Sequence, residues 1–425
     1  MASAQPAAVD DRAPAMDPKA YLKLVGLGAL IGIPAAALAS IFLAFVHDLE
    51  GWMWNDPAQW YLVIFLPAVG ASIVVIARKF LPGDGGHSPL KGFGGGAVPL
   101  VNGFGIALAA IGTLAFGAVL GPEAPLIALG AVAAGAVTLF ARLGEKEQTV
   151  IGTAGSFAAI SALFGGPVVG GTLMVESGLG LGLGSMLLPV LLPGFVAAAV
   201  GYVLYVGFGS WGGLNTQGLV VPDLPPYHGT HIYDLIIGVV VGIVAAVLIA
   251  VVRRAAHPLE DEGPKRLGMP ALLVLGGLAV GLIAQIADWM GADSQEVLFS
   301  GQTAIPAVAA TTSTKILLVL LAAKALAYAV SLGCGFRGGP IFPALFLGIA
   351  CAEFPHTWFG TSPTLAVAVG AAAGMAAGTR LLITSALFAS LLVGSAGVDA
   401  VPAAVLAACA AWLAAQAIDR RADAA

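Results

Sequence analysis

The sequence predicts an all-α integral membrane protein made of many tilted and broken helices. Three observations carry this prediction: the hydropathy, the length of the apolar segments, and a ten-residue motif that occurs twice. Of the 425 residues, 59% are hydrophobic and 10% are charged, and the mean hydropathy is +0.96. Soluble domains carry roughly a quarter charged residues, so this composition excludes an ordinary soluble enzyme.

The apolar segments lack the regular polar alternation of β-barrel porins. A helix that spans a bilayer needs about 20 apolar residues, and several segments are shorter or are interrupted by Gly and Pro. Broken helices at membrane depth are tolerated only where the backbone is buried in protein or lines a cavity, so we expect a transporter or channel. The expected segments are, in chain order, 20–46, 60–78, 99–120, 123–142, 148–164, 166–179, 185–208, 234–252, 269–287, 313–333, 340–353, 364–378, 381–395 and 400–417.

The basic residues predict the orientation in the membrane. The stretches 47–59 and 209–233 contain no Lys or Arg, so we expect them outside. The polar linker 253–267 and both termini are expected in the cytoplasm, with the protein in the plasma (inner) membrane. The residues that mark the cytoplasmic side are Lys19, Lys23, Arg78, Lys79, Arg142, Lys146, Arg253, Arg254, Lys265, Arg266, Arg420 and Arg421.

The expected domain organisation is one transmembrane domain over 18–418, with a first repeat over about 20–208 and a second over about 234–417. Residues 1–17 are expected to form a disordered cytoplasmic tail, because they are rich in Ala, Pro and Asp and lack the pattern of a signal peptide. Residues 419–425 are expected to form a short cytoplasmic tail, and no soluble domain is expected at either end.

Charge and cysteine content exclude several classes of function. The 18 Lys and Arg against 23 Asp and Glu give a net charge of −5, which leaves no basic patch for nucleic acid. The three cysteines have neither a disulfide pattern nor metal-ligand spacing. No His, Asp or Cys pair has the spacing of an intramembrane enzyme such as H-E-x-x-H. We expect no cofactor, no metal and no catalytic residue.

One motif occurs in both halves of the chain. Residues 121–130 (GPEAPLIALG) and 339–348 (GPIFPALFLG) share five of ten positions, at an offset of 339 − 121 = 218. Glycine permits a sharp break, and proline fits the first turn of a helix because it needs no donor there. Each copy is therefore predicted to begin a helix inside the membrane.

Two helix N-termini that point at one spot would form an anion site. Each N-terminus leaves amide groups without partners and carries about half a positive charge. Such a site attracts an anion without binding it too tightly to leave. The alternative is that both breaks are bends in a packed bundle.

At these motifs the sequence resembles the CLC family of chloride channels and proton-coupled chloride transporters. Residues 121–125 (GPEAP) resemble the family motif G-x-E-G-P, and residues 338–343 (GGPIFP) resemble G-G-x-F-x-P. The run 158–176, from Ala158 to Glu176, resembles the family's A-A-x-x-A-x-F-x-x-P segment and the acidic residue that ends that helix. The resemblance extends over about 82–400, and it implies a CLC-like inverted repeat and a homodimer with one pathway per subunit.

The resemblance also implies roles for individual residues. Glu123 is the expected gating glutamate, because its carboxylate competes with the anion for the same amides and leaves when it is protonated. The possible proton path comprises Glu176 and Ser177. The expected anion-binding positions, mainly through the backbone, are Gly86, His87, Ser88, Gly121, Ile341 and Phe342. The helix-break positions are Pro122, Pro125, Gly338, Gly339, Pro340 and Pro343.

Three departures from the family pattern bear on function. Gly86 stands at the position of the motif serine, so the usual hydroxyl is missing unless Ser88 replaces it. Ser177 stands where the family has an inner proton-path glutamate. The central tyrosine of the family's last helix is absent, since the last tyrosine of this chain is Tyr328.

These departures favour passive or loosely proton-coupled chloride transport, and they leave other hypotheses open. An obligate chloride/proton exchanger would keep Glu123 as its essential acid. A fluoride exporter is conceivable because the serine motif is altered, although the asparagine typical of that branch is missing. A cation-coupled carrier of organic anions would also use half-helices.

Overall fold

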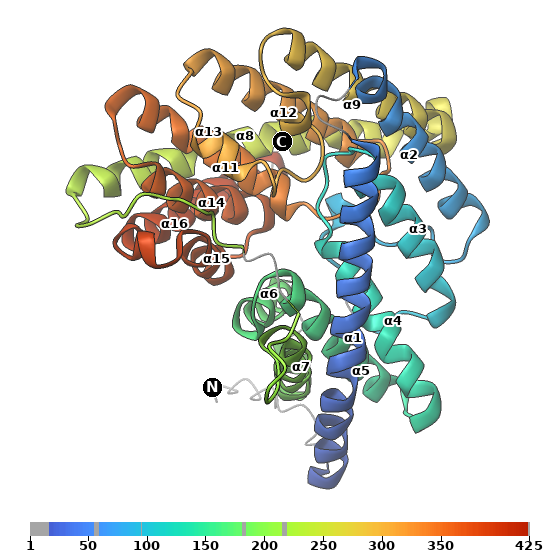
Figure 1. Ribbon diagram of the computed structural model, residues 1–425. Coiled ribbons are helices and arrows are strands. Elements are labelled where there is room, and N and C mark those ends of the chain that lie inside the picture. Colours follow the sequence, from blue (N-terminus) through green and yellow to red (C-terminus); the bar gives the residue numbers. More distant parts are fainter. Residues whose placement is uncertain (1–16, 55–58, 95, 181–183, 215–218, 424–425) are drawn as a thin grey trace, which may run out of the picture.

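The computed structural model describes residues 17–54, 59–94, 96–180, 184–214 and 219–423, and this part of the chain is almost entirely helical (Figure 1). The expected tail 1–17 lies outside the described residues, except for Asp17. The helices of the first half are α1 (Pro18–Met53), α2 (Trp60–Phe80), η1 (Pro89–Lys91), η2 (Leu100–Asn102), α3 (Gly103–Leu114), α4 (Glu123–Ala141), α5 (Glu145–Leu163), α6 (Pro167–Gly180) and α7 (Gly184–Val206). The helices of the second half are α8 (Ile232–Leu267), α9 (Met269–Trp289), α10 (Ser294–Val297), α11 (Ile305–Ala309), α12 (Thr314–Gly333), α13 (Ile341–Phe359), α14 (Pro363–Thr379), α15 (Ile383–Val393), η3 (Gly394–Ala400) and α16 (Val401–Asp423).

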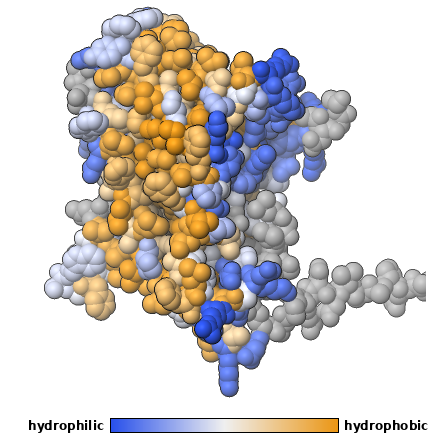
Figure 2. All heavy atoms as spheres, turned by 90° about the vertical axis from the view of Figure 1, so that its right-hand side faces the viewer, coloured by the Kyte–Doolittle hydropathy of each residue, from blue (hydrophilic) through white to orange (hydrophobic). Residues whose placement is uncertain are grey.

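The all-α membrane fold is confirmed. Among the described residues, eight helices are long and apolar enough to cross a membrane. Figure 2 shows a continuous apolar surface on one face, with polar side chains gathered at its edges. A water-soluble monomer rarely exposes so large an apolar patch, whereas a lipid-facing surface requires one. The chain is a multi-pass membrane protein.

The packing repeats between the two halves of the chain. Helix α4 packs against α5 as α13 packs against α14, and α1 packs against α5 and α7 as α8 packs against α14 and α16. Corresponding helices also meet across the halves, since α2 packs against α9 and α6 against α15. In Figure 1 the group α1, α4, α5 and α7 lies apart from the group α8, α13, α14 and α16. This is the pattern expected of two structural repeats related by an axis that runs between α2 and α9 and between α6 and α15.

Two helices extend beyond their expected apolar segments. The segment 253–267 is not a linker, because α8 continues through it to Leu267. The last helix also continues beyond the apolar run, to Asp423. In both places charged residues follow the apolar run, and α8 continues through this stretch even though it contains Pro258 and Pro264.

The start of α13 is held in place by close packing against α14. Gly348 lies against the carbonyl oxygen of Gly370, and Gly374 lies against that of Ala344, so a Cβ at either glycine would collide with backbone. Small residues let helix backbones approach in this way in membrane bundles. The contact fixes the axis of α13.

We expect Gly374→Ala to separate α13 from α14, because the new Cβ meets a backbone oxygen that cannot turn aside. Overpacking of this kind costs about 1–3 kcal/mol, so the thermal unfolding midpoint of the purified protein should fall. The matched control is Gly26→Ala in α1, where no heavy atom lies within 4 Å of the new Cβ. This control should keep or slightly raise the midpoint, and equal midpoints for the two variants would contradict the close contact.

Candidate anion site

Two reciprocal hydrogen bonds join the repeated motifs. The amide of Gly121 donates to the carbonyl oxygen of Gly339 at 2.7 Å, and the amide of Gly339 donates to that of Gly121 at 2.6 Å. Helices α4 and α13 each begin two residues later, after a proline N-cap that has no amide hydrogen. The two helix starts therefore lie side by side, as the repeated motif predicted.

Glu123 occupies this junction. Its side chain is fully buried, and its Oε1 accepts a hydrogen bond from the amide of Ile341, the first residue of α13. Its Oε2 is buried and has no hydrogen-bond partner among the described residues. The carboxylate thus lies at the positive end of the opposing helix, where a negative charge is stabilised.

Two glycines form the walls around this carboxylate. A Cβ on Gly121 would collide with Glu123 Oε2, and a Cβ on Gly339 would collide with Glu123 Cδ. Side chains at either position would displace the carboxylate. The glycines of the repeated motif therefore serve both the backbone pairing and the close fit of Glu123.

An aromatic cluster lies directly beyond the start of α13. The ring centroid of Phe342 lies 5.9 Å from that of Phe164 and 6.1 Å from that of Phe388, and the last two are 5.0 Å apart. All three rings are fully buried. The side chain of Phe342 is therefore part of an apolar wall, and its expected contribution to anion binding is confined to its amide. Phe388 carries no motif that sequence analysis could have used.

Tyr328 is the main residue near the site that the sequence did not reveal. It is buried in α12, and its hydroxyl donates to the carbonyl oxygen of Pro340 at 3.0 Å. Pro340 is the N-cap of α13, so Tyr328 holds the residue that precedes the first amides of α13. No motif surrounds Tyr328, and only its position 12 residues before Pro340 could have linked the two.

The structure does not bring Ser88 or His87 to Glu123. The Ser88 hydroxyl donates to Glu260 Oε1 of α8 at 2.5 Å, and His87 Nε2 lies 3.2 Å from the carbonyl oxygen of Lys91. Gly86 has φ +100°, a conformation that favours glycine over serine. The hydroxyl missing at Gly86 is therefore not supplied by Ser88 in this conformation.

Glu176 caps the N-terminus of α15. Its Oε1 accepts from the amides of Leu382 (3.1 Å) and Ile383 (2.8 Å). Its Oε2 accepts from the amide of Thr384 (2.7 Å) and from the hydroxyl of Thr384 (2.6 Å). The neighbouring Ser177 hydroxyl is buried and has no partner among the described residues. This geometry supports a structural role for Glu176.

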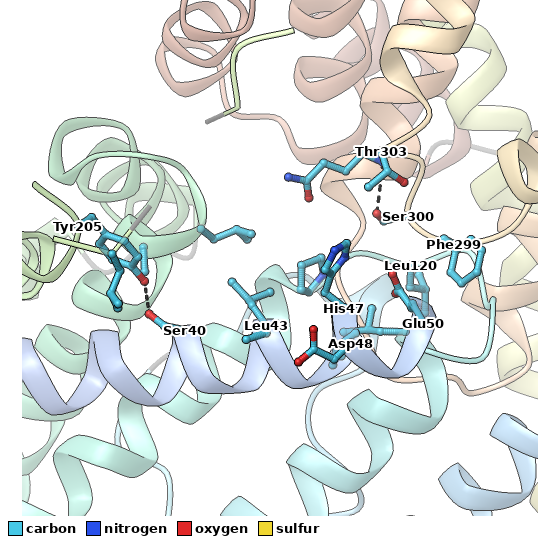
Figure 3. Close-up of a pocket in the computed structure, with 18 residues that line it drawn as sticks. Ser40, Leu43, His47, Asp48, Glu50, Leu120, Tyr205, Phe299, Ser300 and Thr303 are labelled. Atoms are coloured by element: carbon cyan, nitrogen blue, oxygen red, sulfur yellow. Dashed lines mark hydrogen bonds between the residues drawn. The ribbon is translucent and has the colours of Figure 1, made fainter. Parts of the chain in front are cut away.

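A cavity of about 440 Å³ reaches the other side of the helix break (Figure 3). Leu120 and Pro122, which flank Gly121, form part of its wall. Other lining residues are Ser40, His47, Asp48 and Glu50 of α1, Tyr205 of α7, and Phe299, Ser300, Gln302 and Thr303 of the segment before α11. The cavity therefore lies beside the break at Gly121, and Glu123 is not among its lining residues.

The chain is similar to several known proteins. Residues 85–415 match the family described as voltage gated chloride channel. The chain is 26% identical to chloride channel protein CLC-f of Arabidopsis thaliana over 362 residues, which cover 77% of this chain and 44% of that protein. It is 29% identical over 350 residues to a protein of Escherichia coli that carries the name ion-transport protein YfeO, with 77% of each chain covered. The chain spans less than half the length of the Arabidopsis relative.

Solved structures show the same fold. A slow cyanobacterial Cl⁻/H⁺ antiporter matches with a TM-score of 0.73 and 16% identity, over 95% of this chain and 96% of that chain. A CLC-type fluoride/proton antiporter matches with a TM-score of 0.71 and 21% identity, over 94% and 96%. At these identities the similarity establishes the fold alone.

We expect Glu176→Ala to destabilise the protein, because three amides and the Thr384 hydroxyl lose their acceptor. Loss of a helix N-cap costs about 0.5–2 kcal/mol, so the thermal midpoint should fall clearly. Thr384→Val removes one of the four donors and should have a smaller effect. A wild-type midpoint in Glu176→Ala would exclude the capping role and favour the proton path instead.

Proposed function

Because the chain belongs to the voltage-gated chloride channel family, we propose that it transports chloride or a related small anion through the junction of α4 and α13, with Glu123 as the gate. One observation carries this proposal: the buried Glu123 carboxylate accepts a hydrogen bond from the backbone amide of Ile341. A permeant anion would need that same amide. Protonation of Glu123 removes its negative charge and releases the position to the anion.

The residues on the inner side favour passive or loosely proton-coupled transport. Ser177 stands where the family has a titratable residue, and a serine holds no exchangeable charge at accessible pH. The loop at Gly86 carries no hydroxyl, and Ser88 is engaged by Glu260. A looser inner constriction allows chloride to move without an obligatory proton.

The second candidate is an obligate chloride/proton exchanger. Two observations support it. Glu123 is buried with its Oε2 lacking a hydrogen-bond partner among the described residues, and two of the solved structures with a similar fold are antiporters. In this candidate protons reach Glu123 through water or along Glu176 or His87. For both candidates we propose a homodimer in the plasma (inner) membrane with cytoplasmic termini.

We expect Glu123→Gln to keep chloride transport and lose its pH dependence. Wild-type efflux should rise as the pH falls, since protonation frees the site, whereas glutamine mimics the protonated acid at every pH. The measurement is chloride efflux from proteoliposomes between acidic and neutral pH. Wild-type pH dependence in Glu123→Gln would refute the gate, and a wild type that moves organic anions but no chloride would favour the carrier hypothesis.

Proton movement under a chloride gradient separates the two candidates in the same liposomes. Passive transport predicts little uphill proton uptake by the wild type. Robust uphill uptake that collapses in Glu123→Gln would establish the exchanger.

We expect Gly339→Ala to displace the Glu123 carboxylate. Like Glu123→Gln, this variant should then transport chloride with little dependence on pH. The new Cβ collides with the end of a flexible side chain, so the carboxylate moves while the backbone pairing remains. Chloride efflux at neutral pH should rise by about 10-fold, which corresponds to about 1.4 kcal/mol. Gly338→Ala is the control, because its Cβ meets Leu120 Cβ at 2.6 Å instead of Glu123. If both variants keep wild-type pH dependence, the proposed fit of Glu123 between the glycines is wrong.

A further inference from the structure

The cavity of about 440 Å³ shown in Figure 3, here called the outer cavity, has the size of a site for a small organic ligand. Three of its lining residues, His47, Asp48 and Glu50, belong to the stretch 47–59 that we expect outside the membrane. His47 and Asp48 are exposed, and Glu50 is half-buried. Solutes in the outer solution can therefore reach this cavity.

One end of the outer cavity is acidic. Its lining residues include the carboxyl groups of Asp48 and Glu50 but no lysine or arginine. No ion pair engages either carboxyl group within the described part of the chain. His47, on the same helix, adds positive charge only when it is protonated. Two acidic groups without a basic partner attract a cation.

The end of α1 strengthens this attraction. Glu50 lies in the last turn of α1, which ends at Met53, and this turn contains no basic residue. The last carbonyl groups of a helix carry a partial negative charge, so a carboxylate is unfavourable there and a cation is stabilised. The helix end and the two carboxyl groups therefore favour a positive charge at the same place.

The rest of the outer cavity is largely apolar. Burial of hydrocarbon in such surroundings is favourable, whereas a hydrated inorganic ion makes no favourable contact with them. The apolar lining residues are Leu43, Leu114, Leu120, Leu163, Leu214 and Phe299. An acidic end beside an apolar wall matches a cation that carries a hydrocarbon body.

Two further observations favour an organic cation. The described residues contain no group of three His, Cys, Asp or Glu that could hold a metal ion. Lys324, behind the wall that Phe299 forms, donates to the carbonyl oxygens of Leu298 at 2.7 Å and Phe299 at 3.1 Å, and it is not a lining residue. Its ammonium group is therefore engaged by the backbone and does not occupy the acidic end.

We propose that the outer cavity binds a small organic ammonium ion. Its charged group lies at Asp48 and Glu50, and its hydrocarbon body packs against the leucines beside the break at Gly121. In Figure 3 Ser300 and Thr303 lie across the cavity from α1, so they form the opposite wall. The proposal is independent of the proposed anion transport, because it concerns a cation that binds from the outer solution.

The test is titration calorimetry of the full-length protein in lipid nanodiscs at pH 8, with empty nanodiscs as the background. The probe is cyclohexylammonium, and it should bind at least about 10-fold more tightly than neutral cyclohexanol. Methylammonium has the same charged group without the hydrocarbon body, so it should bind at least about 10-fold more weakly than cyclohexylammonium. Equal affinities of cyclohexylammonium and cyclohexanol would overturn the proposal, and so would calcium binding without cyclohexylammonium binding.

Variants of the lining locate the site. Asp48→Asn and Glu50→Gln should each weaken cyclohexylammonium binding by about 3- to 5-fold. Asp223→Asn is the matched control, because Asp223 is an exposed aspartate of the outer stretch 209–233 that does not line the cavity. Thr303→Lys keeps both carboxyl groups and places a tethered ammonium group in the cavity, so it should abolish binding even if the acidic variants do not fold. Wild-type affinity in Thr303→Lys, or in both acidic variants, would refute the site.

Discussion

The backbone pairing of Gly121 with Gly339 places the two halves of the chain against each other at the point where both helices break. Each glycine donates one hydrogen bond and accepts one, so the pairing has the symmetry of the repeat itself. Because the pairing is short and direct, the amides that follow it in α4 and α13 are brought to one place. The position of Glu123 and the start of α13 at Pro340 depend on it, whereas close packing against α14 fixes the axis of α13.

The backbone pairing at this junction is symmetric, but the two copies of the motif carry different side chains. Glu123 and Ile341 occupy equivalent positions of the repeated motif, yet one supplies a carboxylate and the other supplies the amide that binds it. A charged side chain near the centre of a bilayer costs about 2.5 kcal/mol or more. The amide and the dipole of the opposing helix offset part of this cost, while the unpartnered Oε2 leaves part of it in place. This balance supports the proposed role of Glu123 as a gate.

The chain departs from the family pattern around Gly86 and Ser177, on the side of the site that we expect to face the cytoplasm. Gly86 has no side-chain hydroxyl, and the Ser88 hydroxyl donates to Glu260. The Glu176 carboxylate accepts hydrogen bonds from amides at the start of α15. The polar contacts on this side are instead made by charged residues from both repeats, with Asp84 between Arg78 and Arg337.

The sequence alone determined the membrane class, nearly all the helical segments and the repeated motif, and it singled out Glu123, whose gate role stays a prediction. These features depend on local composition: apolar length sets a spanning helix, and Gly followed by Pro sets a helix break. Sequence also led to the family through the residues around Glu123 and Pro340. It failed at 253–267, because polarity indicates the end of a hydrophobic segment but does not end a helix.

Only the tertiary structure decided which polar groups meet. Arg337 and Asp84 are 253 residues apart, and Glu176 lies 206 residues before the first amide that it caps. Ser88 was a candidate for the anion contact from its place in the motif, but α8 brings Glu260 within 2.5 Å of its hydroxyl. Tyr328 lies in a helix without any motif, and packing alone directs its hydroxyl to Pro340. Such pairings depend on how helices distant in the sequence pack together, and a local sequence pattern does not show which distant residues meet.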